Sequence, residues 1–149
     1  MTEQAFSKYR EFVKNGDEVS LLVLKGHLAV EELLTAIVKT ILGSNEEIND
    51  ARLSFHQKRL LAKAGAGRNS QDTVWKILEA INSLRNDIGH NLEPTKSTIL
   101  INKIESQLKN RDPEGYALIP DLDNKADILS HAVSFCIGYL EAYLREKNA

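Results

Sequence analysis

Hydrophobic positions along the chain recur mostly at steps of three and four residues, the spacing of an amphipathic helix. The clearest case is segment 70–88, whose apolar residues form one continuous stripe. No stretch alternates apolar and polar residues long enough to predict a strand. All three prolines lie beyond residue 90, so the first part of the chain carries no strong helix breaker. The pattern therefore predicts an all-α protein.

Glycine, proline and capping residues divide the chain into six predicted helices. We predict helices over Thr2–Val13, Glu18–Leu42, Glu46–Ala64, 70–88, Thr95–Lys109 and Asn124–Glu146. The second is so rich in apolar residues that we expect it at the centre of the fold. Ser44 and Glu47 match a capping box that opens the third helix. Residues 65–69 are predicted to be a loop, and residues 110–122 an irregular connection.

Length and composition fit one globular domain over residues 1–149, with 42% hydrophobic and 27% charged residues. Short connections between helices favour antiparallel neighbours. The expected architecture is thus a bundle of five or six mostly antiparallel helices.

Charge and cysteine content narrow the class of protein. A formal net charge of −2 excludes a strongly basic surface of the kind that drives non-specific DNA binding. The single cysteine, Cys136, lies among apolar residues, so we expect a buried thiol and no disulfide. No apolar run is long enough to cross a membrane, and the first residues lack a signal-peptide pattern. We therefore expect a cytoplasmic protein.

The segment LRNDIGH, residues 84–90, is the strongest candidate for chemistry. Arg85 borders the apolar stripe, and Asn86 and His90, four residues apart, nearly align on another side of the helix. His90 lies where the helix is predicted to stop, so its ring can turn back toward Arg85. An arginine can then hold a phosphate while a histidine moves a proton, with Asn86 orienting either group.

The same residues also have ordinary structural explanations. Arg85 is a favourable cation near the negative end of the helix dipole. His90 can cap the last carbonyl groups. Asn86 and Asp87 are then plain solvated residues, and the segment is only the polar end of a helix.

His27 and Glu31 are four residues apart on one predicted helix, a spacing that can serve a metal ion. No second pair of ligands has suitable spacing, and the pattern HExxH is absent, so we predict no metal site. A buried hydrogen-bonded pair, or a pair that supports Arg85, is the better interpretation.

A basic run lies near the end of the third predicted helix, at Lys58, Arg59, Lys63 and Arg68. A solvated face is the default interpretation of such a run, and contact with an RNA backbone is the alternative. The following Gly65-Ala66-Gly67 lacks the lysine and hydroxyl residue of a phosphate-binding loop, so no nucleotide cofactor is predicted. Trp75 is expected in the core or in a dimer interface.

The 84–90 segment resembles the signature motif of the HEPN superfamily of small all-helical proteins. That motif is an arginine, usually followed by a polar residue such as asparagine, and then a histidine after four to six residues. Arg85, Asn86 and His90 match its shortest form. The layout of residues 18–109 is also similar, through GHLAVEELLTAIV, ARLSFHQKRLLAKAG and AINSLRNDIGHNL.

The resemblance implies a metal-independent endoribonuclease that works as a homodimer with its two motifs facing each other. The RNA 2′-hydroxyl would attack the adjacent phosphate and leave a 2′,3′-cyclic phosphate and a 5′-hydroxyl. Arg85, Asn86 and His90 would be the catalytic residues, with Glu31 or Glu32 as a weaker acidic candidate from an early helix. Many members are toxins or antiviral defence proteins, often held by an antitoxin partner.

Whether the chain is an enzyme stays open, because some members of this superfamily are not catalytic. The mannitol operon repressor family has a similar layout, so a noncatalytic regulator or adaptor that binds a protein or ligand is the alternative. The third hypothesis is a plain interaction module, in which the polar end of the helix has no catalytic or ligand-binding role. If the chain is a ribonuclease, we expect the motifs of two copies to face each other. If it is a regulator, we expect the motif to be buried in ion pairs. If it is a plain interaction module, we expect Arg85 and His90 to be exposed and apart.

Overall fold

A computed structural model describes residues 4–5, 7, 17–43, 45–67, 72–90 and 96–149. Seven helices pack together in the described ranges, which contain no strand. They are α2 (Asp17–Leu42), α3 (Glu46–Ala51), α4 (Phe55–Ala66), α5 (Asp72–His90), α6 (Ser97–Arg111), α7 (Pro113–Ala117) and α8 (Lys125–Asn148). The predicted all-α bundle is confirmed.

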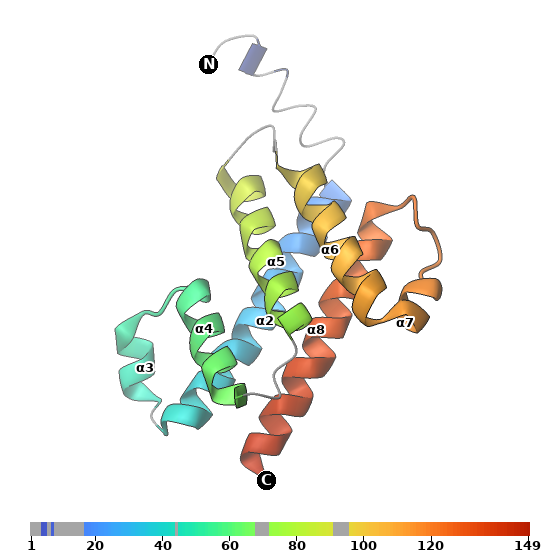
Figure 1. Cartoon of the computed structure of the whole chain (residues 1–149). Helices are drawn as coiled ribbons and strands as arrows, with labels where there is room; N and C mark the ends of the chain where they lie inside the picture. The colour runs from blue at the N-terminus through green and yellow to red at the C-terminus, as the bar shows by residue number, and fades with distance from the viewer. Residues whose placement is uncertain (1–3, 6, 8–16, 44, 68–71, 91–95) are drawn as a thin grey trace.

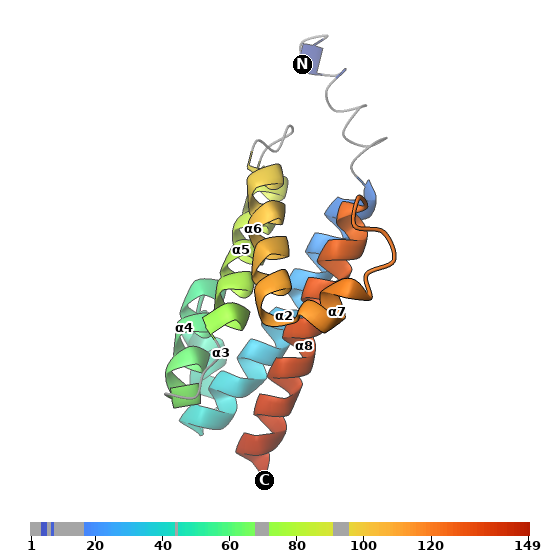
Figure 2. The ribbon, with the colours of Figure 1, turned by 45° about the vertical axis from the view of Figure 1, so that its right-hand side comes forward.

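Helix α2 lies at the centre and contacts α8, α4 and α5, as its apolar composition predicted. Helix α5 runs antiparallel to its neighbours α2, α4, α6 and α8, whereas α2 and α8 lie side by side in parallel (Figures 1 and 2). The parallel pairing arises because α7 and the connection after it lead the chain back before α8 begins. The short α3 has the same effect between α2 and α4.

The predicted single helix over Glu46–Ala64 is wrong, because the chain breaks between α3 and α4. Arg52 adopts a left-handed conformation with φ 50° and ends α3. Ser54 then starts α4 with a reciprocal cap: the Gln57 amide donates to Ser54 Oγ at 3.1 Å, and the Ser54 amide donates to Gln57 Oε1 at 2.8 Å. The sequence analysis does not predict this second capping box, formed by Ser54 and Gln57.

Two predicted loops contain helical structure. Helix α4 continues through Ala66 and ends at Gly67, whose φ of 70° suits glycine. Within residues 110–122, Asp112 caps the short α7 by accepting from the Gly115 amide at 3.1 Å. Most of the predicted helix Thr2–Val13, and the Ser44 cap, lie outside the described residues.

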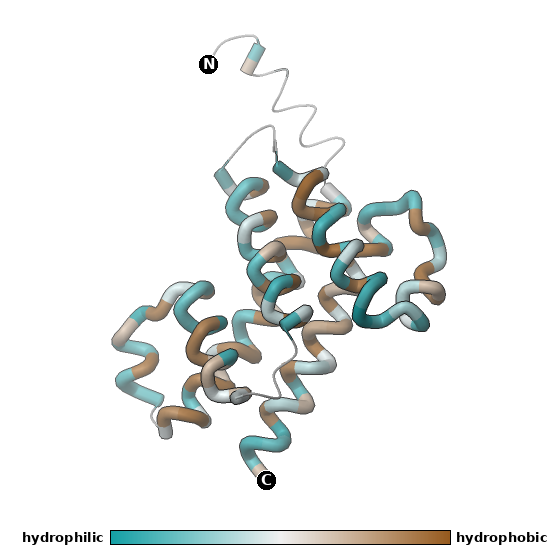
Figure 3. The backbone as a smooth tube through the Cα atoms, viewed as in Figure 1, coloured by the Kyte–Doolittle hydropathy of each residue, from teal (hydrophilic) through white to brown (hydrophobic). Residues whose placement is uncertain are grey.

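The core is formed by the inward faces of α2, α4, α5, α6 and α8. Trp75 is buried there, with Tyr139 and Tyr143 packed edge-on against it at centroid distances of 5.9 and 6.5 Å. Cys136 is fully buried as predicted, and burial raises the pKa of its thiol to about 12. Figure 3 shows that the last turns of α8 are hydrophilic and extend past this core. In the part of the chain that is described, no helix is long and apolar enough to cross a membrane.

Candidate functional site

The LRNDIGH segment forms the C-terminal end of α5, and the helix continues through His90. Asn86 and His90 are both exposed and lie on one face of the helix, roughly 40° apart around its axis. Arg85 is half-buried and lies roughly 140° from His90. The structure ends the helix at His90, slightly later than predicted, and the turn of the His90 ring toward Arg85 stays a prediction. By backbone position, Asn86 and His90 share one side of α5 and Arg85 starts from another.

Because Gly89 has no side chain, the Arg85 guanidinium can lie against the backbone at that position. A Cβ atom at position 89 would lie 3.5 Å from Arg85 Nη1, so the side chain runs along its own helix toward the C-terminus. No hydrogen bond or ion pair among the described residues engages Arg85, Asn86 or His90. The carbonyl end of α5 lies near Arg85 and stabilises its positive charge.

Asp87 holds the end of α5 against the start of α6. The prediction of a solvated carboxylate is wrong, because Asp87 is only 6% exposed. It accepts from the Lys96 backbone amide at 3.1 Å and from Ser97 Oγ at 3.2 Å. The helix turn that carries Arg85 and Asn86 is thus fixed in place by a buried charge with hydrogen-bond donors around it.

A buried polar contact joins α2 to α5 one turn before the motif. His27 is 6% exposed, and its Nε2 lies 2.9 Å from Asn82 Oδ1. Because the amide oxygen can only accept, Nε2 carries the proton. The imidazole also stacks on Phe55, with ring centroids 4.4 Å apart. Around the axis of α5, Asn82 lies between the two motif residues, roughly 60° from Arg85 and roughly 40° from Asn86.

The contact extends to the surface through an acidic and a basic residue. His27 Nδ1 lies 3.7 Å from Glu31 Oε2, and Lys58 Nζ lies 3.3 Å from Glu31 Oε1. We call Lys58, Glu31, His27 and Asn82 the polar bridge. The sequence interprets His27 and Glu31 either as a buried hydrogen-bonded pair or as a pair that supports Arg85, but it does not predict the contact with Asn82. Its signal in the sequence is an amide directly beside the apolar stripe of its helix.

The other weak candidates are placed differently. Glu32 is exposed on α2, on the side away from the polar bridge. Arg59 is 6% exposed, and its Nη2 lies 3.2 Å from His56 Nδ1 and 3.9 Å from Glu79 Oε2. The default interpretation of a solvated basic face therefore fails at Arg59, which faces inward. Arg68 lies outside the described residues.

Lys58 and Lys63 also face acidic groups, Lys63 at 3.8 Å from Asp72 Oδ1. The described residues contain no group of three or more His, Cys, Asp or Glu side chains able to hold a metal ion. The groups available for chemistry at the end of α5 are thus an imidazole, an amide and a guanidinium.

These groups suit proton transfer and the binding of an anion. An imidazole can take or give a proton, and a guanidinium provides a planar fork of donors for phosphate oxygens. The two side chains start from positions roughly 140° apart around the helix, and the Arg85 guanidinium lies beside Gly89, the residue before His90. Comparison with family models, with curated proteins and with solved structures found no match to this chain.

Proposed function

We propose that this chain is a metal-independent endoribonuclease of the HEPN type, active as a homodimer. The observation that carries the proposal is the Arg85-Asn86-x3-His90 motif at the exposed end of an amphipathic helix in an all-α bundle. The buried Asp87 and the polar bridge support it, because they hold that helix end on two sides without occupying His90. Catalytic groups need such rigid support.

In the proposed reaction His90 takes the proton from an RNA 2′-hydroxyl. The 2′-oxygen forms a bond to the adjacent phosphorus, and the bond from phosphorus to the 5′-oxygen breaks. The partner's His90 gives a proton to the leaving 5′-oxygen. Arg85 stabilises the charge that builds on the phosphate oxygens. The products are a 2′,3′-cyclic phosphate and a 5′-hydroxyl.

The proposal requires two copies because the reaction uses one histidine as the base and another as the acid, and each chain supplies one His90. A net charge of −2 argues against broad RNA affinity and favours a restricted target. We propose a role as a toxin or antiviral defence protein in the cytoplasm, controlled by an antitoxin or other protein partner.

A noncatalytic protein is the second candidate, and the separation of Arg85 and His90 without an ion pair favours the plain interaction module over a regulator whose motif is buried in ion pairs. Arg85 and His90 can then each serve a separate contact with a partner protein. Such a protein needs no proton transfer, so replacement of His90 would change binding and leave RNA intact.

The test is induced expression of the wild-type chain, His90→Ala and Lys76→Ala, followed by mapping of new 2′,3′-cyclic phosphate ends in total RNA. Lys76 is an exposed residue of the same helix and serves as the matched control. The ribonuclease predicts growth arrest and new ends with the wild type and Lys76→Ala, and neither with His90→Ala. Equal behaviour of all three at equal soluble expression would favour the noncatalytic protein.

A further inference from the structure

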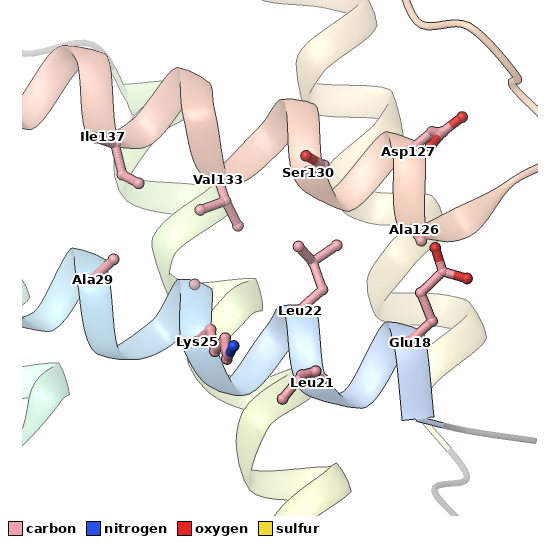
Figure 4. A pocket seen from close by; sticks show the side chains of 11 residues that line it. Glu18, Leu21, Leu22, Lys25, Ala29, Ala126, Asp127, Ser130, Val133 and Ile137 are labelled. Carbon is pink, nitrogen blue, oxygen red and sulfur yellow. The ribbon is translucent and has the colours of Figure 1, made fainter. Parts of the chain in front are cut away.

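A groove of about 500 Å³ lies between the N-terminal halves of α2 and α8. Figure 4 shows Leu22 of α2 and Val133 of α8 pointing into it, with Glu18 and Asp127 at one end. Gly26 lies opposite Val133, and a Cβ there would come within 2.9 Å of a Val133 methyl group. The two helices therefore approach each other closely at Gly26, and the groove beside this contact is lined mostly by aliphatic side chains.

Two strongly exposed leucines border the groove on α2. Leu21 lines it and is 53% exposed, and Leu28, two helical turns further on the same side of α2, is 63% exposed. An exposed apolar surface of this kind marks a place where another element binds. We call it the apolar groove, and its residues are Leu21, Leu22, Leu28, Ala29, Val133 and Ile137.

We propose that the N-terminal segment of the same chain, residues 2–13, binds the apolar groove as a helix antiparallel to α2. The sequence predicts that helix, and its twelve residues equal the length of each wall of the groove, 18–29 in α2 and 126–137 in α8. Only residues 14–16 separate the segment from Asp17, where α2 begins. Loops of about two to five residues join antiparallel helices, so the segment has the length and the connection needed to cover the groove.

The apolar residues of the segment form one stripe. At about 100° per residue they fall within an arc of roughly 120° around the predicted helix. They are Ala5, Phe6, Tyr9, Phe12 and Val13. Gln4 and Ser7, which are helical and exposed in the structure, belong to the opposite, polar face. A short helix with three aromatic side chains on one face is stabilised mainly by burying them against another element, and the apolar groove is such a surface.

The charges of the segment also favour this direction. Residues 8–14 carry a net charge of +2, from three basic residues and one acidic residue. In the antiparallel arrangement they lie beside the start of α2, at the end of the groove that holds Glu18 and Asp127. No ion pair or hydrogen bond among the described residues engages either carboxylate. Lys25, the base that lines the groove, lies two turns further along α2, so complementary charge at the near end adds to the apolar contact.

The structure shows the groove uncovered, because Gln4 and Ala5 lie beyond the start of α2 in Figures 1 and 2. The closed arrangement requires the chain to reverse direction within residues 14–16. Gly16 can adopt the backbone angles that end a helix before such a turn. The groove contains no residue of the LRNDIGH segment, so the inference stands whether or not His90 cleaves RNA.

The experiment is hydrogen–deuterium exchange of the full chain, measured by mass spectrometry on peptides that cover residues 2–13. We expect the amides of the segment to exchange roughly 10-fold slower in the wild type than in a variant whose groove is filled. Ser130→Trp fills the groove, because Ser130 is exposed and lines it. Ser134→Trp is the matched control, because Ser134 is exposed one turn further along α8 and does not line the groove.

Variants of the segment provide a second check. Tyr9→Ser removes an aromatic ring from the stripe and should abolish the slow exchange of residues 2–13. Gln4→Ser changes only the polar face and should leave that exchange slow. A helix that forms without binding the groove would respond to neither Tyr9→Ser nor Ser130→Trp beyond their controls.

Equal exchange of the segment in the wild type, Ser130→Trp and Ser134→Trp would overturn the proposal. Exchange at the rate of an unfolded peptide in the wild type would also overturn it. Protection that increases with protein concentration between about 1 and 100 μM would show that the segment binds another copy and not its own groove. None of these readouts depends on RNA cleavage, so failure of the His90→Ala assay leaves them unchanged.

Discussion

Replacement of Asn82 by alanine tests whether the polar bridge stabilises the fold. His27 is 6% exposed, and its Nε2 depends on Asn82 Oδ1 at 2.9 Å. Every buried side-chain nitrogen and oxygen in the described part of the chain has a hydrogen-bond partner. Asn82→Ala would therefore leave the buried His27 Nε2 without its partner. A buried donor left without a partner costs about 1–3 kcal/mol. Alanine favours the helix over asparagine by about 0.5 kcal/mol, which offsets part of that cost.

Asn86→Ala is the matched control for this prediction, because Asn86 lies one turn further along the same helix and is exposed. It gains the same helix propensity and loses no buried partner. The difference between the two variants therefore isolates the contact with His27, and we expect about 2 kcal/mol. For a chain of this size that corresponds to roughly 4–8 °C in melting temperature.

The assay is urea unfolding followed by circular dichroism, with all variants at one pH. Replacing both partners, as His27→Leu/Asn82→Leu, should recover much of the loss, since no polar group is then left unpaired. If Asn82→Ala and Asn86→Ala agree within about 0.5 kcal/mol, the contact contributes nothing and the reasoning fails.

Two further predictions concern parts of the fold away from α5. The buried Cys136 thiol, with its pKa raised to about 12, should resist alkylation in the folded chain and react at once in denaturant. Because the folded state keeps a proton that the unfolded thiol loses, stability should fall by about 1.4 kcal/mol per pH unit as pH rises above 9. Cys136→Ala should lack that part of the alkaline loss in urea titrations, and equal pH profiles would contradict it. Ser54→Ala removes one half of the capping box of α4 and should cost about 1 kcal/mol, measured by thermal unfolding, whereas Ser134→Ala on the exposed surface of α8 should be near neutral.

The sequence predicted the helices best where an apolar stripe was long, as in α2 and α5. The predicted helix ends were wrong where the conformation of a single residue determines the end of the helix. The backbone of Arg52 is in the left-handed region although the residue is not glycine, and its side chain gives no reason to predict that conformation. The Ser54 and Gln57 box was visible in the sequence, but it lay inside a segment that read as one continuous helix.

The candidate site was predicted only as far as local spacing reaches. The alignment of Asn86 with His90 follows from their separation of four residues and holds in the structure. The contact of His27 with Asn82 spans 55 residues and depends on how two helices pack, which no local pattern specifies. The burial of Asp87 likewise depends on where α6 begins.

Helix α3 has no buried residue, and it ends in the left-handed Arg52 before α4 begins. It lies beside the bundle and contributes nothing to the core (Figure 1). Its amide protons should therefore exchange with deuterium through local opening, far faster than those of α5, at a free energy well below that of global unfolding. The same independence makes residues 46–51 a natural place to insert a peptide tag or fluorophore without disturbing α5.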